Sequence, residues 1–438
     1  MKSKNKGGGR VPSPHLRKMD RKKKKSPLPW KTLFSVGLGL VILVAIIVIA
    51  AKGCGGDTPT SGAIFGTPPP AQGATPTPNW EDNVRPEPVD KYVMTWDYKP
   101  TAFEGVPEGV NVLCPTWLYV EEGESGAPNF ENIADQGVSA DFEGYVNGAH
   151  GAGAEVWGTV VSFNPELSKQ VITDGTTRQA FCAWLAEQVE ALNLDGLCLD
   201  FERMDPDNKM DYSALVFQVK SSLPKDKTVC VSVTVKTAVE QPDNWYQSYD
   251  YPSLAEAADY IALMAYDQHT ISSEAAGPGA ALPWVEDRLQ RALWEIPSDQ
   301  LILGIPFYGY DFPHAIPEGT KDVERDAEPV WKNGDMKAVA VLRAQVEKLN
   351  SDGEVTVRNQ ALAVDHWVTR DTWSDEFQVR YLSFVDKQGL LHRLWYEDDQ
   401  SVAKKASLVK QYHLKGAAVW QQDYGRDSMW RAVFDAVQ

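Results

Sequence analysis

The stretch Asp195-Gly196-Leu197-Cys198-Leu199-Asp200-Phe201-Glu202 predicts a buried β-strand that ends in acidic residues. Side chains alternate between the two faces of a strand. The apolar side chains therefore fall on one face, and Cys198, Asp200 and Glu202 fall on the other. An apolar face packed under helices, with carboxyl groups at the end of the opposite face, is typical of a strand in a parallel barrel, where chemistry gathers at the carboxyl ends of the strands.

Runs of this kind recur from about Val89 to the C-terminus and alternate with amphipathic helical runs. Eight strands are expected, at Lys91–Tyr98, Val110–Val120, Ala154–Phe163, Gly196–Glu202, Val229–Thr237, Tyr260–Asp267, Leu301–Tyr310 and Gly416–Gln421. Helices are expected at Phe142–Ala149, Thr177–Leu192, Tyr212–Leu223, Pro283–Glu295 and near Ser428–Val437. This alternation predicts an α/β fold, a closed (β/α)8 TIM barrel with a parallel sheet and crossover helices.

One interval, about residues 313–396, is too long to connect the seventh and eighth expected strands directly. It contains a helical pattern at Met336–Leu349. It also contains β-like segments, at Glu354–Val357, Gln378–Phe384 and Leu390–Trp395. We expect a small α+β insertion here that forms one wall of a groove beside the barrel.

The N-terminal part of the chain differs sharply in charge from the rest. Residues 1–32 form a basic tail that carries a net charge of +11, which leaves −28 for the remainder of the chain. Residues 33–51 follow without a single charge and are rich in Val, Ile and Leu. Nineteen such residues are enough to span a hydrocarbon core of about 30 Å. The positive-inside rule then places the tail in the cytoplasm and residues 89–438 outside the cell.

The alternative for this segment is a cleaved signal peptide, although its apolar run exceeds the usual length and no clean cleavage site follows. We favour a retained single-pass anchor in the cell membrane. Residues 52–88 are rich in Gly, Pro and Thr and predict a disordered linker. The basic run Arg21–Lys25 is best explained as a topology signal that touches anionic lipid, and we expect no nucleic-acid partner.

The five cysteines show neither CxxC nor His-linked metal spacing. The four in residues 89–438 fall in apolar stretches, so buried free thiols are expected, and a disulfide stays open for a domain outside the cell. His269 is the only histidine near the expected strand ends, without a second ligand at suitable spacing. The sequence therefore predicts neither a metal nor a cofactor.

The carboxyl ends of the expected strands are rich in aromatic and acidic residues. The candidates there are Trp96, Trp117, Asp200, Glu202, Tyr266, Asp267, Gln268, Tyr308 and Trp420. Sugars have apolar C–H faces and polar rims, so stacked aromatic rings with nearby acids favour a carbohydrate ligand. A nucleotide would require a Gly-rich loop, and none occurs at a strand-to-helix junction. Any single aromatic among these candidates can instead cap the core.

These motifs resemble glycoside hydrolase family 18, the chitinase-like barrels. Asp195–Glu202 resembles the DxxDxDxE signature of that family, Met264–Asp267 its sixth-strand motif, and Trp420 its eighth-strand tryptophan. The resemblance covers roughly residues 90–435. It is closer still to the spore-cortex-lytic and germination branch, on the segments Pro115–Trp117, Asp200–Glu202, Met264–His269, Leu282–Val285, Gly304–Gly309 and Trp395–Asp398.

The resemblance implies a glycosidase that cleaves β-1,4 bonds next to N-acetylated sugars with retention, by a substrate-assisted mechanism. It implies three catalytic residues: Glu202 as the general acid, Asp200 as the group that holds the acetamido N–H, and Tyr266 as a partner of the acetamido oxygen. Asp267, Trp420, Trp117, Tyr308, Gln268 and Trp96 are the expected substrate-binding residues. Cys198 departs from the signature, because chitinases have an aspartate there.

The expected partner is an N-acetylated glycan, and the branch resemblance with an outward-facing anchor favours peptidoglycan or spore cortex over chitin. Two alternatives remain on the same barrel. One is a glycan-binding, lectin-like module without catalysis, against which the presence of Glu202 argues. The other is a sporulation protein whose barrel docks partners.

Overall fold

The computed structural model describes residues 79–236, 245–273, 275–315, 339–341, 354–357, 360–363, 367–385 and 389–438. The expected basic tail, the apolar segment 33–51 and most of the linker lie outside these ranges. Among the described residues, no helix combines the length and the apolar character that crossing a membrane requires. The membrane anchor therefore stays a prediction from the sequence.

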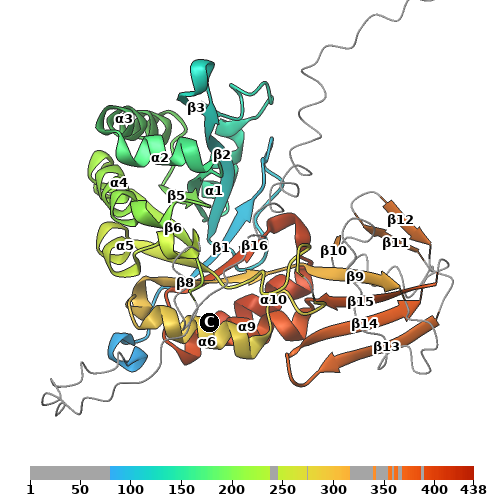
Figure 1. Ribbon diagram of the computed structural model, residues 1–438. Coiled ribbons are helices and arrows are strands. Elements are labelled where there is room, and N and C mark those ends of the chain that lie inside the picture. Colours follow the sequence, from blue (N-terminus) through green and yellow to red (C-terminus); the bar gives the residue numbers. More distant parts are fainter. Residues whose placement is uncertain are drawn as a thin grey trace, which may run out of the picture. The chain divides into compact units, whose positions relative to one another are not determined.

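Eight parallel strands close into a barrel (Figure 1). They are β1 (Tyr92–Asp97), β2 (Val112–Glu122), β4 (Glu155–Ser162), β5 (Gly196–Phe201), β6 (Thr228–Thr234), β7 (Tyr260–Met264), β8 (Leu301–Pro306) and β16 (Gly416–Trp420). Each strand pairs in parallel with its neighbour in that order, and β16 pairs with β1 to complete the circle. The barrel predicted from the alternation is confirmed, with strand ends shifted by a few residues.

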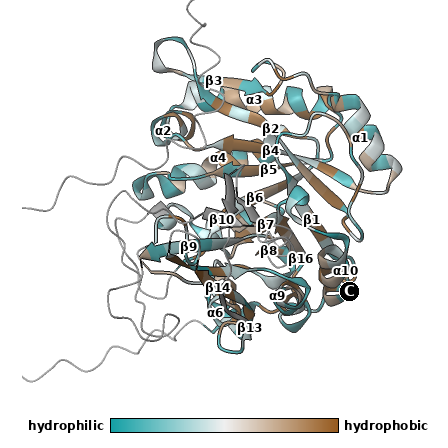
Figure 2. Ribbon diagram, turned by 90° about the vertical axis from the view of Figure 1, so that its right-hand side faces the viewer, coloured by the Kyte–Doolittle hydropathy of each residue, from teal (hydrophilic) through white to brown (hydrophobic). Residues whose placement is uncertain are grey.

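Helices connect most of these strands; Figure 1 shows α2 to α5 along the outside of the sheet, and Figure 2 shows α1 at its outer edge. Their bounds are α1 (Phe142–Gly151), α2 (Pro165–Thr173), α3 (Gly175–Ala191), α4 (Lys209–Ser222), α5 (Tyr251–Ala257), α6 (Leu282–Leu293), α9 (Asp399–Gln411) and α10 (Asp427–Val437). The five helices expected outside the insertion are confirmed, whereas α2, α5 and α9 were not expected. Helix α9 begins with a capping box in which Asp398 and Ser401 bond reciprocally.

The two faces of β5 divide as the alternation predicts. Leu197, Leu199 and Phe201 belong to the apolar layer between the strands and the helices. Cys198 points the other way, into a separate core inside the barrel that it shares with Met94, Trp96, Val112, Cys114, Trp157, Cys230, Ala262, Ile302 and Ala418. In Figure 2 the brown, hydrophobic colour runs along strands such as β2 and β4. Asp200, two residues beyond Cys198, therefore faces the inside of the barrel.

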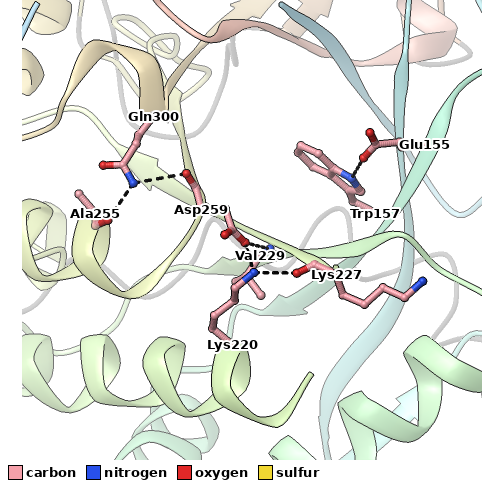
Figure 3. A network of polar contacts seen from close by, with 8 residues as sticks. All are labelled: Glu155, Trp157, Lys220, Lys227, Val229, Ala255, Asp259 and Gln300. Carbon is pink, nitrogen blue, oxygen red and sulfur yellow. Dashed lines mark hydrogen bonds and ion pairs between the residues drawn. The ribbon is translucent and has the colours of Figure 1, made fainter. Parts of the chain in front are cut away.

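Polar bonds fix the amino-terminal ends of the strands, opposite to the end where β5 carries its acids (Figure 3). The ammonium group of Lys220 donates to the carboxylate of Asp259 at 2.6 Å and to the carbonyl of Lys227 at 2.7 Å. The same carboxylate accepts the N–H of Val229 at 2.7 Å. The Trp157 indole donates to Glu155 at 2.8 Å. Contacts at this end of a barrel serve stability.

A second, antiparallel sheet leaves the barrel after β8. Its order is β10-β9-β15-β14-β13, and a separate pair joins β11 to β12. The bounds are β9 (Gly309–Ala315), β10 (Val339–Val341), β11 (Glu354–Val357), β12 (Gln360–Ala363), β13 (Trp367–Ser374), β14 (Val379–Val385) and β15 (Leu390–Tyr396). The short strand β3 (Pro128–Asn132) instead pairs antiparallel with the far end of β2.

Two expectations about this insertion are corrected. The run Leu301–Tyr310 is not one strand, because β8 ends at Pro306 and β9 begins at Gly309 in the other sheet. Gly309 packs so closely on β15 that an added Cβ would lie 1.9 Å from the carbonyl oxygen of Trp395. The helix expected over Met336–Leu349 is contradicted at Val339–Val341, which forms β10, and its remaining residues lie outside the described ranges.

Candidate active site

Asp200 is the last inward-facing residue of β5. Its side chain is buried, with 5% of the residue exposed. Burial raises the pKa of this carboxyl well above its usual range, and the neighbouring charges of Glu202 and Cys198 raise it further. Its Oδ1 atom has no hydrogen-bond partner among the described residues. A buried acceptor without a partner is costly, and a catalytic role is one of the reasons for which native structures keep such an atom.

Glu202 follows directly after the end of β5. Its backbone N–H donates to the carbonyl of Ser162 on β4 at 3.0 Å, which fixes where the side chain starts. Burial raises the pKa of the Glu202 carboxyl to about 7, the Arg203 guanidinium opposes this shift, and the charge of Asp267 adds to it. A carboxyl group that titrates near neutral pH is suited to donate a proton as a general acid.

Tyr266 lies among the acids. Burial raises the pKa of its phenol well above the usual range, and the charges of Asp200, Asp267 and Glu202 add to the shift. A Cβ added at Gly304 on β8 would lie 3.0 Å from the Tyr266 ring, so glycine there leaves room for the ring. The structure thus brings the three predicted catalytic residues together at the carboxyl ends of β5 and β7.

Asp267 forms a second polar centre beside them. Its Oδ1 accepts a hydrogen bond of 2.6 Å from the Tyr308 hydroxyl and one of 2.7 Å from the Tyr310 hydroxyl. The residue is exposed to solvent, yet protein atoms surround its carboxyl group closely enough that burial raises its pKa, while the two tyrosine bonds lower it. Asp267 also has a left-handed backbone, with a φ of 62°.

Gln268 has a partly structural position. Its Oε1 accepts the backbone N–H of Ala281 at 3.0 Å, and its own N–H donates to the carbonyl of Gly279 at 2.8 Å. These bonds hold the segment before α6 against the end of β7. A role of Gln268 in substrate binding stays a prediction.

Two of the predicted tryptophans lie at the end of β16 and β1. Trp420 is half-buried, and its ring centroid lies 5.9 Å from that of Trp96. Trp96 is only 1% exposed. Trp420 can therefore present a face to a ligand, while the buried Trp96 packs beside it on the neighbouring strand.

The substrate-binding role predicted for Trp117 is wrong in this structure. Trp117 is 1% exposed and packs against Phe142 and Tyr145 of α1, in the layer between strands and helices. Its indole N–H already donates to the carbonyl of Pro100 at 3.0 Å. Cys114 faces the barrel interior, so alternation turns a residue three positions later towards the helices.

Several residues near the acids were missed by the sequence analysis. Burial raises the pKa of the Tyr246 phenol, and the negative charges of Asp267 and Glu202 raise it further. It belongs to the 3₁₀ turn Trp245–Ser248, which is attached beyond β5 by the bond from the Ser248 hydroxyl to the carbonyl of Met204 at 2.6 Å. The turn lies far from β5 in the sequence and belongs to no motif with it. The sequence therefore holds no pattern that would have identified Tyr246 as a neighbour of the acids.

Two exposed aromatic residues also stand at strand ends. Tyr98 follows β1 and is 51% exposed, and Phe163 follows β4 and is 45% exposed. Large apolar side chains at this exposure are available to pack on a ligand. Both are the last residues of strands expected from the sequence, and that position was a usable signal. The residues that the structure describes contain no group of three His, Cys, Asp or Glu side chains able to hold a metal ion.

The family model described as Glycosyl hydrolases family 18 matches residues 163–425, more than half of the chain. This range begins at the end of β4 and ends shortly after β16, so it contains both acids of β5, Tyr266, Asp267 and Trp420. The chain belongs to glycosyl hydrolases family 18. The resemblance noted in the motifs is confirmed, and the protein is a glycosidase by family.

Two proteins from Bacillus species are similar in sequence to this family 18 glycosidase. The uncharacterized glycosylase YvbX of Bacillus subtilis (strain 168) is 27% identical over 276 residues, which are 63% of this chain and 70% of that protein. The cortical fragment-lytic enzyme of Bacillus anthracis is 24% identical over 276 residues, 63% of this chain and 57% of that protein. The match thus spans little more than half of the second relative.

A solved structure has the same fold as this family 18 chain. The crystal structure of the Bacillus cereus spore cortex-lytic enzyme SleL matches with a TM-score of 0.64 at 18% sequence identity, and the match covers 80% of this chain and 75% of that one. At this identity the likeness shows a common fold, and the chemistry has to be argued from the residues described above.

Proposed function

We propose that this family 18 glycosidase hydrolyses β-1,4 bonds next to N-acetylated sugars, with Glu202 as the general acid. The observation that carries the proposal is the environment of Glu202: burial and the charge of Asp267 place its pKa near 7, so a large fraction is protonated at neutral pH. General acid catalysis contributes typically about 10²- to 10⁴-fold to the rate.

The second acid has a different task. Asp200 lies deeper in the barrel, and its Oδ1 has no partner among the described residues. We assign this oxygen to the acetamido N–H of the substrate, and the Tyr266 hydroxyl to the acetamido oxygen. The acetamido oxygen then attacks the anomeric carbon, so the protein supplies no nucleophile, as in the substrate-assisted exceptions among retaining glycosidases.

The surrounding residues support a sugar-binding subsite. Trp420 offers a half-buried ring for the apolar face of a sugar, and Trp96 packs beside it. Asp267 is fixed by two tyrosine hydroxyls and stays accessible to sugar hydroxyl groups. Tyr308 acts in this scheme by orienting Asp267. No metal or cofactor is needed for these steps.

Peptidoglycan or spore cortex is our preferred substrate over chitin. The motif resemblance to the cortex-lytic branch supports this choice, as does the relative whose name describes an enzyme lytic for cortical fragments. The part of the chain after the basic tail is acidic, so anionic wall polymers would repel it. Recognition of the glycan must therefore rest on contacts within the site.

The test compares Glu202→Gln with Glu190→Gln, a matched change of an exposed glutamate on α3. New reducing ends are measured on purified cortex, vegetative peptidoglycan and chitin oligosaccharides. Glu202→Gln should lose at least about 100-fold on natural glycans. It should lose far less on an aryl glycoside, whose leaving group needs no proton, and Glu190→Gln should match the wild type.

An unchanged rate in Glu202→Gln would disprove the assignment of the acid. Glycan binding by the wild-type chain without new reducing ends would instead support the lectin-like alternative. Mass spectrometry of the products on defined glycans then identifies which bond is cut.

We further propose that residues 33–51 anchor the enzyme in the cell membrane, with the catalytic domain outside the cytoplasm. The uncharged apolar run and the basic tail before it support this proposal. The full chain should remain in the membrane fraction after alkaline extraction. A variant with Val44→Asp and Ile47→Asp should be released, because each charge costs about 3 kcal/mol at the centre of a helix. Release of the unmodified chain would contradict the anchor.

A further inference from the structure

Three cysteines face the inside of the barrel directly below the acids of β5. Cys114 lies on β2, Cys198 on β5 and Cys230 on β6, and all three are fully buried in the interior core. The fourth described cysteine, Cys182, lies on α3 in the outer layer. None of the interior thiols has a part in the proposed hydrolysis.

Cys198 and Cys230 are partners in the parallel ladder between β5 and β6. Neighbouring strands lie about 4.8 Å apart, which is within the range of about 4.4–6.8 Å between the Cα atoms of disulfide-bonded cysteines. The Ser232 hydroxyl lies 3.4 Å from the Cys198 sulfur, and the Cys114 and Cys230 thiols are close enough to lower the pKa of the Cys198 thiol. Cys114 has no such register with Cys198, because β4 runs between β2 and β5.

We propose that Cys198 and Cys230 are a redox-sensitive pair that closes to a disulfide between β5 and β6 and thereby lowers the activity of the site above it. This effect on activity rests on the proposed function, whereas formation of the disulfide does not.

The oxidant is a low-molecular-weight disulfide such as oxidised glutathione. One cysteine thiolate attacks a sulfur of the oxidant, which breaks its S–S bond and releases one glutathione. The second cysteine then attacks the mixed disulfide and releases the other glutathione. The two cysteines lose two electrons and two protons, and the two glutathione thiols receive them.

Cys198 is the better placed of the two to start this exchange. Hydrogen bonds from Cys114 and Cys230 lower the pKa of the Cys198 thiol, whereas burial raises the pKa of Cys230. The thiolate is the reacting form of cysteine. All three thiols are shielded from solvent, so the exchange requires local opening of the barrel and should be slow.

The resulting bond should be strained and easy to reduce. Side chains at one register position of parallel strands point in the same direction, so their Cβ atoms are about as far apart as the strands, near 4.8 Å. Disulfides have a mean Cβ separation of about 3.8 Å, and departures from this geometry make the bond more reducible. A labile bond of this kind suits regulation better than permanent support.

Closure would reach the active site through the backbone of β5. Asp200 lies two residues beyond Cys198 on the same face of the strand, and the charge of Cys198 contributes to its raised pKa. Pulling Cys198 towards β6 displaces Asp200 and removes the ionisable thiol below it. Misplacement of catalytic groups by about 1 Å can cost about 100-fold in rate.

The test uses the full chain in detergent, reduced first and then incubated for hours with oxidised and reduced glutathione at a series of ratios. Peptide mapping by mass spectrometry without reduction should find the peptides of Cys198 and Cys230 linked. Activity should fall at least about fivefold as linkage proceeds, and dithiothreitol should restore it. Cys182→Ala should behave as the wild type, whereas Cys230→Ala should keep its activity throughout the series.

Three outcomes would overturn the proposal: no linked peptide at any ratio, linkage of Cys198 to Cys114 instead, or full activity of the linked form. If Cys230→Ala fails to fold, the peptide map and the activity of the wild-type chain still decide. If the reduced chain has no activity on any glycan, the proposed function fails, but the peptide map still reports whether the pair forms.

Discussion

The hydroxyl of Tyr308 donates a hydrogen bond of 2.6 Å to the carboxylate of Asp267. Tyr308 lies in the two-residue link between β8 of the barrel and β9 of the second sheet, whereas Asp267 follows β7. Tyr310, the second residue of β9, donates to the same oxygen at 2.7 Å. The carboxylate of Asp267 thus fixes the segment that connects the barrel to the second sheet.

This relationship predicts the effect of removing the two hydroxyls. Tyr308→Phe or Tyr310→Phe alone should lower the free energy of unfolding by about 1.5 kcal/mol, at the low end for a hydrogen bond to a charged group, because the other tyrosine remains. The double variant should lose more than the sum, since the carboxylate is left without either donor. Urea denaturation of the wild type, the two single variants and the double variant measures the coupling energy between the two hydroxyls. Strictly additive losses would contradict the prediction.

The barrel was predictable because its signal is local. Alternation along Asp195–Glu202 correctly separated the face of Leu197, Leu199 and Phe201 from that of Cys198. The same rule, counted forward from Cys114, turns Trp117 away from the site, whereas a place near the end of a strand does not decide which face a side chain is on. The prediction for Trp117 is wrong because it depends on the position along the strand alone and not on the face to which alternation assigns the side chain.

Other features have no local signal. Leu301–Tyr310 is apolar throughout, and periodicity cannot show that its last residues join another sheet. The charges of Glu202 and Asp267 act on Tyr246 only because a turn after β6 is attached beyond the end of β5. Such neighbours depend on tertiary packing. Helix α9, in contrast, has a local signal in its sequence, because Asp398 and Ser401 are spaced as a capping box that marks the start of a helix.

The pKa of Glu202 predicts the alkaline side of the pH profile. A general acid must be protonated, so kcat/KM should fall as the pH rises through about 7. Asp267→Asn removes a negative charge that raises this pKa, so it should move the fall to lower pH. Arg203→Gln removes a positive charge that lowers the pKa, so it should move the fall to higher pH. Shifts of both variants in the same direction would refute this electrostatic account.

The contrasting positions of Trp420 and Trp117 predict different losses. Trp420→Ala should raise KM about tenfold, a loss of about 1.4 kcal/mol in binding, with little change in stability. Trp117→Phe should leave KM unchanged and lower the free energy of unfolding by about 1–2 kcal/mol, because it removes buried volume and the bond to Pro100. Steady-state kinetics and urea denaturation of both variants separate the roles. A raised KM in Trp117→Phe would return that residue to the site.

Asp97 predicts a pH-dependent gain in stability on mutation. Burial raises its pKa from 3.8 to about 6, against the hydrogen bond of 2.7 Å from the Tyr145 hydroxyl. The folded state therefore binds the proton more tightly than the unfolded state, which stabilises the protein below about pH 4 and is lost as the pH rises through 6. The ionised carboxylate then costs up to about 3 kcal/mol, at 1.36 kcal/mol per pKa unit.

Asp97→Asn keeps an acceptor for Tyr145 and cannot ionise. The difference in free energy of unfolding between this variant and the wild type should therefore grow in favour of the variant between pH 4 and pH 7. Asp226→Asn, at an exposed position between α4 and β6, is the matched control and should show no such trend. Urea denaturation at both pH values measures the effect. A difference that stays constant with pH would mean that Asp97 is ionised without penalty in the folded barrel, and that Tyr145 alone compensates its burial.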